Sequence, residues 1–129
     1  METEKQELAL HLQTLNQALQ TLQELFQIPY SVIVRDAAIQ RFEYTFELTW
    51  KFFRKIAKRE GIEVTSPRQA IRTIHDLGYA TNIDLWFEFL EGRNLTSHTY
   101  NQFTADQVFD KIKEFPAELV DVLQKIGNS

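Results

Sequence analysis

The sequence predicts an all-α protein, a four- to five-helix bundle that occupies residues 1–129 as a single domain. The first observation behind this prediction is that apolar residues recur at spacings of three and four over long stretches. The second is that only four glycines and three prolines interrupt the 129 residues, so the connections must be few and short. The third is that no stretch of four or more residues alternates convincingly between apolar and polar side chains, as a strand would.

Composition and charge restrict the class of protein. Apolar residues make up 43% and charged residues 25%, a globular composition that excludes a disordered tail or a fibrous repeat. The absence of cysteine excludes a disulfide scaffold and a cysteine nucleophile. No apolar run approaches the ~20 residues of a membrane span, and the acidic first residues are unlike a signal peptide, so we expect a cytoplasmic protein. The net charge of −4 argues against nucleic-acid binding through overall charge, although a local basic patch could still provide it.

Two long helices are expected first. Apolar residues at alternating spacings of four and three predict the first helix, and Pro29 should end it, because the residue before a proline avoids the α region. These residues are Leu8, Leu12, Leu15, Leu19, Leu22 and Phe26. Ser31 is a suitable N-cap for a second helix that reaches Glu60, with Gly61 as its stop. The apolar arc of this second helix contains Ile39, Phe42, Phe46, Thr49, Trp50, Phe53 and Ala57.

A short third helix and an apolar fourth helix should follow. Ser66 and Pro67 suit an N-cap and a first turn, and Gln69 stands where it can complete a capping box. The third helix should stop at Gly78, and the fourth should begin near Asn82. The fourth helix is apolar nearly all round. Either it is buried on all sides, or it meets another chain in a helical homodimer or a stable complex, and we expect the second. An outer arc of the second helix could also form this contact, through Thr45, Leu48 and Phe52.

The last predicted helix begins at Thr104, with Gln107 in the capping-box position. Pro116 lies inside its apolar pattern, so we expect a kink or a break near Ile112. The expected core face of this helix comprises Val108, Ile112, Phe115, Leu119, Val122 and Ile126.

Most residues that could carry chemistry fit structural roles better. His11, His75 and His98 have no metal-binding spacing, and there is no glycine-rich phosphate loop, so we expect neither a metal nor a cofactor. His11 should face solvent, and His75 should lie in the last turn of the third helix, where a cationic imidazole favours the helix dipole.

A row of charges on the second helix permits two interpretations. Glu43, Glu47 and Lys51 follow one another at spacings of four, and a carboxylate pair can perform acid–base chemistry. Such a row is more often a solvated face, here with Glu47 and Lys51 as an ion pair, and we favour that interpretation.

One segment, Glu91–Tyr100, gathers an arginine, a histidine and a tyrosine where a helix ends. Arg93 can bind phosphate oxygens through two parallel hydrogen bonds. His98 can take a proton from a ribose 2′-hydroxyl or return one to a leaving oxygen, and Tyr100 can stack on a base or accept a transferred group. Together they could cleave RNA without a metal, with His98 as acid–base and Arg93 stabilising the charge of the transition state. The alternative is structural: Arg93 caps the helix end and His98 binds a buried carbonyl.

These residues resemble a known family. Arg93-Asn94-x-x-x-His98-x-Tyr100 is similar to the Arg-x4-His-x-Tyr motif of the HEPN superfamily (higher eukaryotes and prokaryotes nucleotide-binding domains), in the form found in HepT toxins. Residues 41–51, which read Arg-Phe-Glu-Tyr-Thr-Phe-Glu-Leu-Thr-Trp-Lys, resemble the branch called nucleotidyltransferase substrate-binding proteins. The resemblance covers nearly the whole chain.

The resemblance implies a dimerising antiparallel bundle whose usual partner is a small, separately encoded minimal nucleotidyltransferase. In the toxin–antitoxin form, such a protein is a metal-independent ribonuclease with its active site in a cleft at the dimer interface. By position, Arg93 and His98 would be the catalytic pair and Asn94 would support the site. Tyr100 would be the residue to which the nucleotidyltransferase transfers AMP, which neutralises the ribonuclease. The other possibility is a non-catalytic subunit that binds nucleotide or substrate for the nucleotidyltransferase.

Overall fold

A computed structural model describes residues 2–129, and all the regular structure in that range is helical. The helices are α1 (Glu2–Phe26), α2 (Val32–Arg59), α3 (Pro67–Asp76), α4 (Ile83–Leu95), a short 3-10 helix (Thr96–His98), α5 (Gln102–Ile112) and α6 (Phe115–Gly127). The predicted all-α class is therefore confirmed. The number of helices differs from the prediction because the last predicted helix is divided into α5 and α6.

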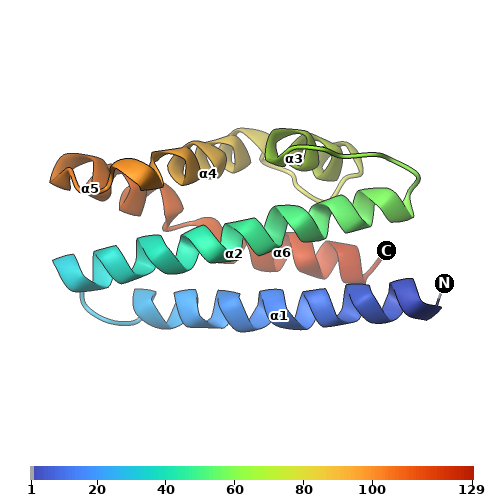
Figure 1. Ribbon diagram of the computed structural model, residues 1–129, viewed down its shortest axis with the longest axis horizontal. Helices are drawn as coiled ribbons and strands as arrows, with labels where there is room; N and C mark the ends of the chain where they lie inside the picture. The colour runs from blue at the N-terminus through green and yellow to red at the C-terminus, as the bar shows by residue number, and fades with distance from the viewer. Residues whose placement is uncertain (1) are drawn as a thin grey trace.

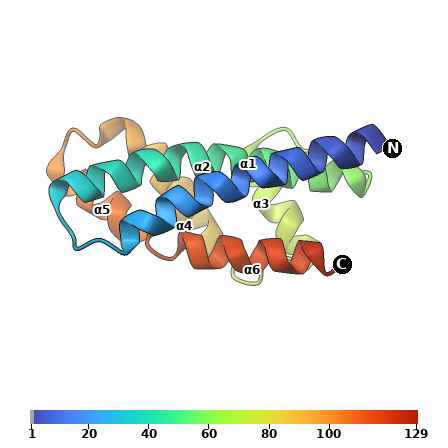
Figure 2. The same cartoon turned by 90° about the horizontal axis from the view of Figure 1, so that it is seen from below.

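The helices are arranged around α2. Figure 1 shows α2 between α1 on one side and the series α3, α4 and α5 on the other. α1 and α2 run antiparallel, and α6 runs back toward the start of α1, so both chain ends lie at the same end of the bundle (Figures 1 and 2). The turn from α1 to α2 and the start of α5 lie at the opposite end. Within residues 2–129, no helix is both long and apolar enough to cross a membrane.

Side-chain caps begin α2, α3 and α4 at the residues that the sequence predicts. Ser31, Ser66 and Asn82 each accept a hydrogen bond from a backbone N–H in the following turn, at 3.1, 3.2 and 3.1 Å. The capping box of α3 closes one residue earlier than expected, because the Gln69 side-chain oxygen accepts from the backbone N–H of Thr65 at 2.9 Å.

The last predicted helix has the expected break but a different start. Helix α5 ends at Ile112, and α6 begins at Phe115 with Pro116 in its first turn, where a proline removes no helical hydrogen bond. The expected N-cap, Thr104, is wrong. Asn101 caps α5 instead, because its side-chain oxygen accepts from the backbone N–H groups of the second and third residues after it, at 2.9 and 3.2 Å.

An aromatic cluster forms the centre of the core. Phe115 is fully buried, and its ring centre lies 5.0 to 6.1 Å from four other aromatic rings, on α2 and α4. These rings belong to Phe42, Phe46, Trp86 and Phe89. Phe115 of α6 therefore packs against both α2 and α4. This packing holds α4 against α2 and so positions the segment that follows α4.

Of the two helix faces that were expected to meet another chain, the outer arc of α2 is covered within this one. Thr45 and Phe52, in the outer arc of α2, are 0% and 1% exposed, because the apolar stripe of α1 packs along that arc. On α4, the ring of Phe87 is covered by α3: the guanidinium carbons of Arg68 and Arg72 lie 4.7 and 5.7 Å from its centre. The prediction that these faces carry a dimer contact is wrong for the α2 arc. On α4, Ile83, Leu85 and Phe87 stay partly exposed, so the contact of this helix with another chain stays a prediction.

Two histidines bind backbone carbonyl groups. The Nε2 atom of His11 donates to the carbonyl oxygen of Leu48 at 2.8 Å, and the ring packs against Phe52, so the expectation that His11 faces solvent is wrong. His11 lies between α1 and α2, where its ring nitrogen can bind a backbone carbonyl of α2 that an apolar side chain could not bind. His75 lies in the last turn of α3, as predicted. Its role there was not predicted: the Nδ1 atom donates to the carbonyl oxygen of Ala80 at 2.6 Å and holds the loop after α3.

Candidate functional site

The segment that carries the arginine, histidine and tyrosine lies at the end of α4. Arg93 and Asn94 occupy the last turn of α4, and the chain then continues through the 3-10 helix into an exposed turn. Two threonine hydroxyls stabilise this exit: Thr96 donates to the carbonyl oxygen of Arg93 at 2.7 Å, and Thr99 to that of Thr96 at 3.1 Å. The local sequence therefore ends the helix in a defined shape and leaves Tyr100 in the turn.

A cleft of about 690 Å³ lies between this segment and the outer side of α2. Its lining residues are Gln40, Glu43, Tyr44, Glu47, Arg93, Asn94, Thr96 and Ser97. Four of them come from α2, from the stretch of residues 41–51 and the residue before it, and four come from the end of α4 and the 3-10 helix. The two segments that carry the family resemblance are therefore the two walls of one cleft.

An ion pair between Glu47 and Arg93 joins the two walls. An Nη2 hydrogen of Arg93 is donated to Oε1 of Glu47, and both side chains are about one-third exposed, at 33% for Glu47 and 35% for Arg93. The second carboxylate oxygen of Glu47 accepts from the indole N–H of Trp50 at 3.1 Å. The predicted pair between Glu47 and Lys51 does not form, because the carboxylate of Glu47 faces the end of α4. The interpretation of this row as a solvated face is therefore wrong at Glu47.

Tyr44 stands at the edge of the cleft with its hydroxyl fixed. The hydroxyl of Thr21 on α1 donates to the carbonyl oxygen of Ala18 at 2.7 Å, so the 2.6 Å bond between Tyr44 and Thr21 has the tyrosine as donor. Arg41 also binds this part of α1, through the carbonyl oxygen of Thr21 at 2.7 Å. The ring of Tyr44 is 41% exposed and held in place, which makes it a suitable surface for stacking.

His98 and Tyr100 are exposed and are not among the residues that line the cleft. Their ring centres lie 6.4 Å apart, and Tyr100 is 82% exposed. The structure thus brings Arg93 and Asn94 together in the cleft but leaves His98 and Tyr100 just outside it in this single chain. Across residues 2–129, no group of three or more His, Asp and Glu side chains is placed to hold a metal ion.

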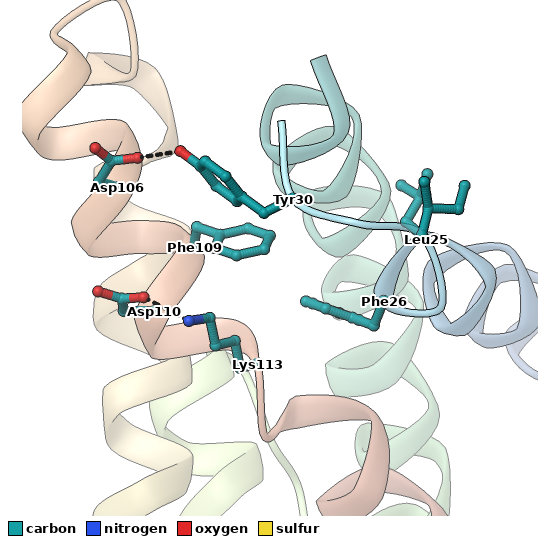
Figure 3. Close-up of a pocket in the computed structure, with 8 residues that line it drawn as sticks. Leu25, Phe26, Tyr30, Asp106, Phe109, Asp110 and Lys113 are labelled. Carbon is teal, nitrogen blue, oxygen red and sulfur yellow. Dashed lines mark hydrogen bonds and ion pairs between the residues drawn. The ribbon is translucent and has the colours of Figure 1, made fainter. Parts of the chain in front are cut away.

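A second hollow, of about 670 Å³, lies at the turn between α1 and α2, against α5 (Figure 3). It is lined by Leu25, Phe26, Ile28, Tyr30, Asp106, Phe109, Asp110 and Lys113. Its polar groups are paired with one another: Tyr30 donates to Asp106 at 2.8 Å, and the ammonium of Lys113 lies 2.9 Å from Asp110 and 5.2 Å from the centre of the Phe109 ring. This internal pairing makes the hollow a weaker candidate for ligand binding than the cleft at Arg93.

A buried arginine beside this hollow fixes the start of α5. Arg35 is 2% exposed, and its guanidinium donates to Asp36 and Asp106 at 3.0 Å each and to Gln102 at 2.6 Å. Hydrogen bonds from Arg35 and Tyr30 lower the pKa of the Asp106 carboxyl, and the bond to Asp106 raises the pKa of the Tyr30 hydroxyl. Because α5 begins two residues after Tyr100, this network also holds the far end of the motif segment.

Sequence reasoning did not identify Glu47 and Tyr44 as residues of the candidate site. The spacing of Glu43 and Glu47 places both on one side of α2, and this was recognised. Which residues that side contacts depends on how α4 packs across α2. The periodicity of one helix does not predict this packing.

The structure defines an all-α bundle with the motif segment at the end of one helix. Within this class, the chain belongs to the family described as nucleotidyltransferase substrate binding protein like, whose profile matches residues 10–128.

Individual relatives agree with this assignment. A Haemophilus influenzae protein named Probable ribonuclease HepT is 28% identical in an alignment of 94 positions, which covers 69% of this chain and 64% of the relative, so the match spans less than two-thirds of the relative's length. A crystal structure of a Thermus thermophilus protein is 36% identical, with a TM-score of 0.80 over 87% of this chain and 98% of that one. Another solved structure, from Haemophilus influenzae, shares the fold at 24% identity, with a TM-score of 0.77 over 90% of this chain and 98% of that one. That structure is described as revealing the fold of a substrate binding domain of a nucleotidyltransferase.

Proposed function

We propose that this protein is a metal-independent ribonuclease that works as the HEPN-type partner of a minimal nucleotidyltransferase in a toxin–antitoxin pair. The observation that carries the proposal is the meeting of the two family-like segments at one cleft, with Arg93 and Asn94 on its wall. The family assignment supports the nucleotidyltransferase partner, and the HepT relative supports the ribonuclease activity.

The chemistry assigns one role to each motif residue. His98 takes the proton of a ribose 2′-hydroxyl, whose oxygen attacks the adjacent phosphorus, and a 2′,3′-cyclic phosphate forms as the bond to the 5′-oxygen breaks. The leaving 5′-oxygen receives a proton from a histidine. Arg93 stabilises the negative charge that develops on the phosphoryl oxygens, because its guanidinium presents donors in the geometry that phosphate accepts. Asn94, beside it on the cleft wall, supports the site.

A homodimer completes the site in this proposal. The exposed position of His98 outside the cleft of a single chain is consistent with a site shared between two copies. Arg93 and His98 from both copies then act across one interface, and RNA is the substrate.

Tyr100 is the proposed acceptor of AMP. Its hydroxyl oxygen attacks the α-phosphorus of ATP, pyrophosphate leaves, and the nucleotidyltransferase supplies the catalysis. At 82% exposure, Tyr100 is open to a partner enzyme. The ring centres of Tyr100 and His98 lie 6.4 Å apart, so an AMP group attached to Tyr100 would bring charge and bulk close to His98 and keep RNA from the histidine.

A second candidate function is a non-catalytic subunit that binds nucleotide or substrate for the nucleotidyltransferase. Two observations favour it: Arg93 is already engaged by a carboxylate, and the chain carries a net charge of −4, which does not attract RNA.

The test is RNA cleavage by the purified protein, free of its partner, with a chelator present and with the unmodified mass of Tyr100 confirmed. We expect the wild type to leave 2′,3′-cyclic phosphate or 3′-phosphate ends. His98→Ala and Arg93→Ala should lower the cleavage rate by about 10²- to 10⁴-fold, the usual effect of removing a general acid–base or a charge-stabilising group. Circular dichroism and gel filtration should show that the variants keep the wild-type fold and assembly.

Two results would decide against the ribonuclease. One is no cleavage by unmodified wild type, which would favour the non-catalytic subunit. The other is unchanged cleavage by His98→Ala. If cleavage is observed, addition of the nucleotidyltransferase and ATP should stop it and add the mass of AMP, and Tyr100→Phe should remain active under the same treatment.

A further inference from the structure

We propose that Glu47 is a positioning residue, which holds the Arg93 guanidinium in the orientation that receives a phosphodiester group of the substrate. This inference rests on the proposed phosphate-binding role of Arg93. It gives a role to a residue of α2 that the Arg-x4-His-x-Tyr motif does not contain.

The contact between Glu47 and Arg93 leaves most of the guanidinium free. A single Nη2 hydrogen is donated to Oε1 of Glu47, and the only other bond of this guanidinium in the described chain is a long one, 3.4 Å, from Nη1 to Asn94. A guanidinium has five N–H donors in a fixed plane. The remaining donors can bind two phosphate oxygens while Glu47 keeps its contact, so the carboxylate orients Arg93 without having to leave.

Glu47 is itself held in place, which is what a positioning residue requires. Its second oxygen accepts from the indole N–H of Trp50, one turn further along α2, at 3.1 Å. The Trp50 ring is covered in turn by the guanidinium of Arg54, whose central carbon lies 5.1 Å from the ring centre. The carboxylate thus has both oxygens committed, one to the helix that carries it and one to Arg93.

The pair has little value as a stabilising contact alone. Both side chains are about one-third exposed, and ion pairs at such positions contribute on the order of 0–1 kcal/mol to folding. A contact that stabilises little but fixes the orientation of a motif arginine in a cleft is better explained by function than by folding.

Four variants test this inference: Glu47→Ala, Glu47→Gln, Trp50→Phe and Glu88→Ala. Glu47→Gln keeps an oxygen that accepts from Arg93 but removes the charge. Trp50→Phe removes only the indole donor. Glu88→Ala is the control, because it removes an exposed carboxylate of α4 that does not line the cleft at Arg93 and forms no ion pair within residues 2–129.

Two measurements are needed, so that failure of this inference is distinguished from failure of the ribonuclease proposal. The first is the dissociation constant for a short oligonucleotide with 2′-deoxyribose at every position, which cannot be cleaved by this chemistry and which tests phosphate binding alone. The second is the single-turnover rate of RNA cleavage. We expect Glu47→Ala to raise the dissociation constant of the deoxyoligonucleotide or to lower the rate of RNA cleavage by about 10- to 100-fold, as misplacement of a binding group does. Glu47→Gln should return to within about threefold of wild type, Trp50→Phe should lie between, and Glu88→Ala should match wild type, with all unfolding midpoints within a few degrees.

Three results would overturn the inference. Equal binding and cleavage by wild type and Glu47→Ala would show that Arg93 needs no support. Equal loss in Glu47→Gln and Glu47→Ala would show that the charge, not the orientation, matters. Tighter binding by Glu47→Ala would show that the carboxylate competes with phosphate. If wild type cuts no RNA but the deoxyoligonucleotide binds in the expected order of variants, the ribonuclease proposal fails and this inference stands.

Discussion

Arg35 is a buried charged residue whose surroundings link the stability of the protein to pH. It is almost fully buried, yet its guanidinium is bonded to two partly exposed carboxylates and an amide oxygen. A buried charge without partners is strongly unfavourable, so the arrangement depends on Asp106 staying ionised. Asp106 is the partner that also binds Tyr30, and both of these groups have shifted pKa values.

The direction of these shifts gives a pH window. The folded pKa of Asp106 lies below its unfolded value of ~3.9, so its contribution to stability is complete above that pH and is lost as pH falls through the folded pKa. The folded pKa of Tyr30 is raised above ~10, so its contribution is complete below that value and is lost as pH rises through the folded pKa. The network should therefore be intact between about pH 4 and pH 10.

Asp106→Asn tests the acidic limit of this window. We expect the variant to be less stable than wild type at pH 7. The difference should begin to shrink below about pH 4 and should approach zero only once the pH has fallen below the lowered folded pKa of Asp106, because the carboxyl is then protonated in both folded and unfolded wild type. Urea unfolding followed by circular dichroism across this pH range would measure it. A stability difference that stays constant with pH would show that the effect of the substitution is not electrostatic.

For single helices, the sequence predicted the N-terminal residues of α2, α3 and α4 correctly but placed the N-cap of α5 at the wrong residue. Serine and asparagine caps preceding apolar runs identified α2, α3 and α4 correctly, because one side chain satisfies orphan N–H groups locally. For α5, Thr104 with Gln107 is an equally good local pattern, but Asn101 three residues earlier takes the position. The difference is tertiary: Arg35 binds Gln102 and Asp106, and so anchors a first turn that begins before Thr104.

Asn101 is therefore expected to matter for both α5 and the motif segment before it. Asn101→Ala should destabilise the protein by about 0.5–2 kcal/mol, the usual cost of losing an N-cap, whereas Asn101→Ser, which keeps a capping oxygen, should recover most of the loss. Thermal unfolding would measure both variants. An unchanged midpoint for Asn101→Ala would mean that the Arg35 network alone determines where α5 begins.

At the scale of the whole molecule, the aromatic cluster around Phe115 holds three helices together. Removal of this ring leaves a cavity among four other aromatic side chains that cannot all move inward. Phe115→Ala should therefore cost about 3–5 kcal/mol, a large part of the 5–15 kcal/mol typical of a domain. Leu10→Ala, at a position that is 63% exposed, should change stability by no more than about 0.5 kcal/mol. Urea denaturation of the two variants measures the contrast, and equal losses would contradict it.

The packing of the helices against one another also explains which part of the site the sequence could not predict. Arg93, Asn94, His98 and Tyr100 form a local pattern and were identified as candidates from one short segment. Glu47 is 46 residues from Arg93, and their contact exists only because Phe115 and its neighbours hold α2 and α4 at one separation and rotation. Periodicity predicts which side of a helix is apolar, but not which residue of another helix a polar side chain will meet.

The chain contains two tryptophans, and the structure places them in very different surroundings. Trp86 is fully buried among aromatic rings, and its indole N–H has no partner within residues 2–129. Trp50 is partly exposed, and its indole N–H is bonded to the carboxylate that holds Arg93. The protein thus carries its own pair of fluorophores, one enclosed and shielded from aqueous quenchers, the other in contact with a residue of the cleft. With Trp86 replaced by phenylalanine, the emission of Trp50 would follow the arrival of RNA or a protein partner in real time, without any added dye.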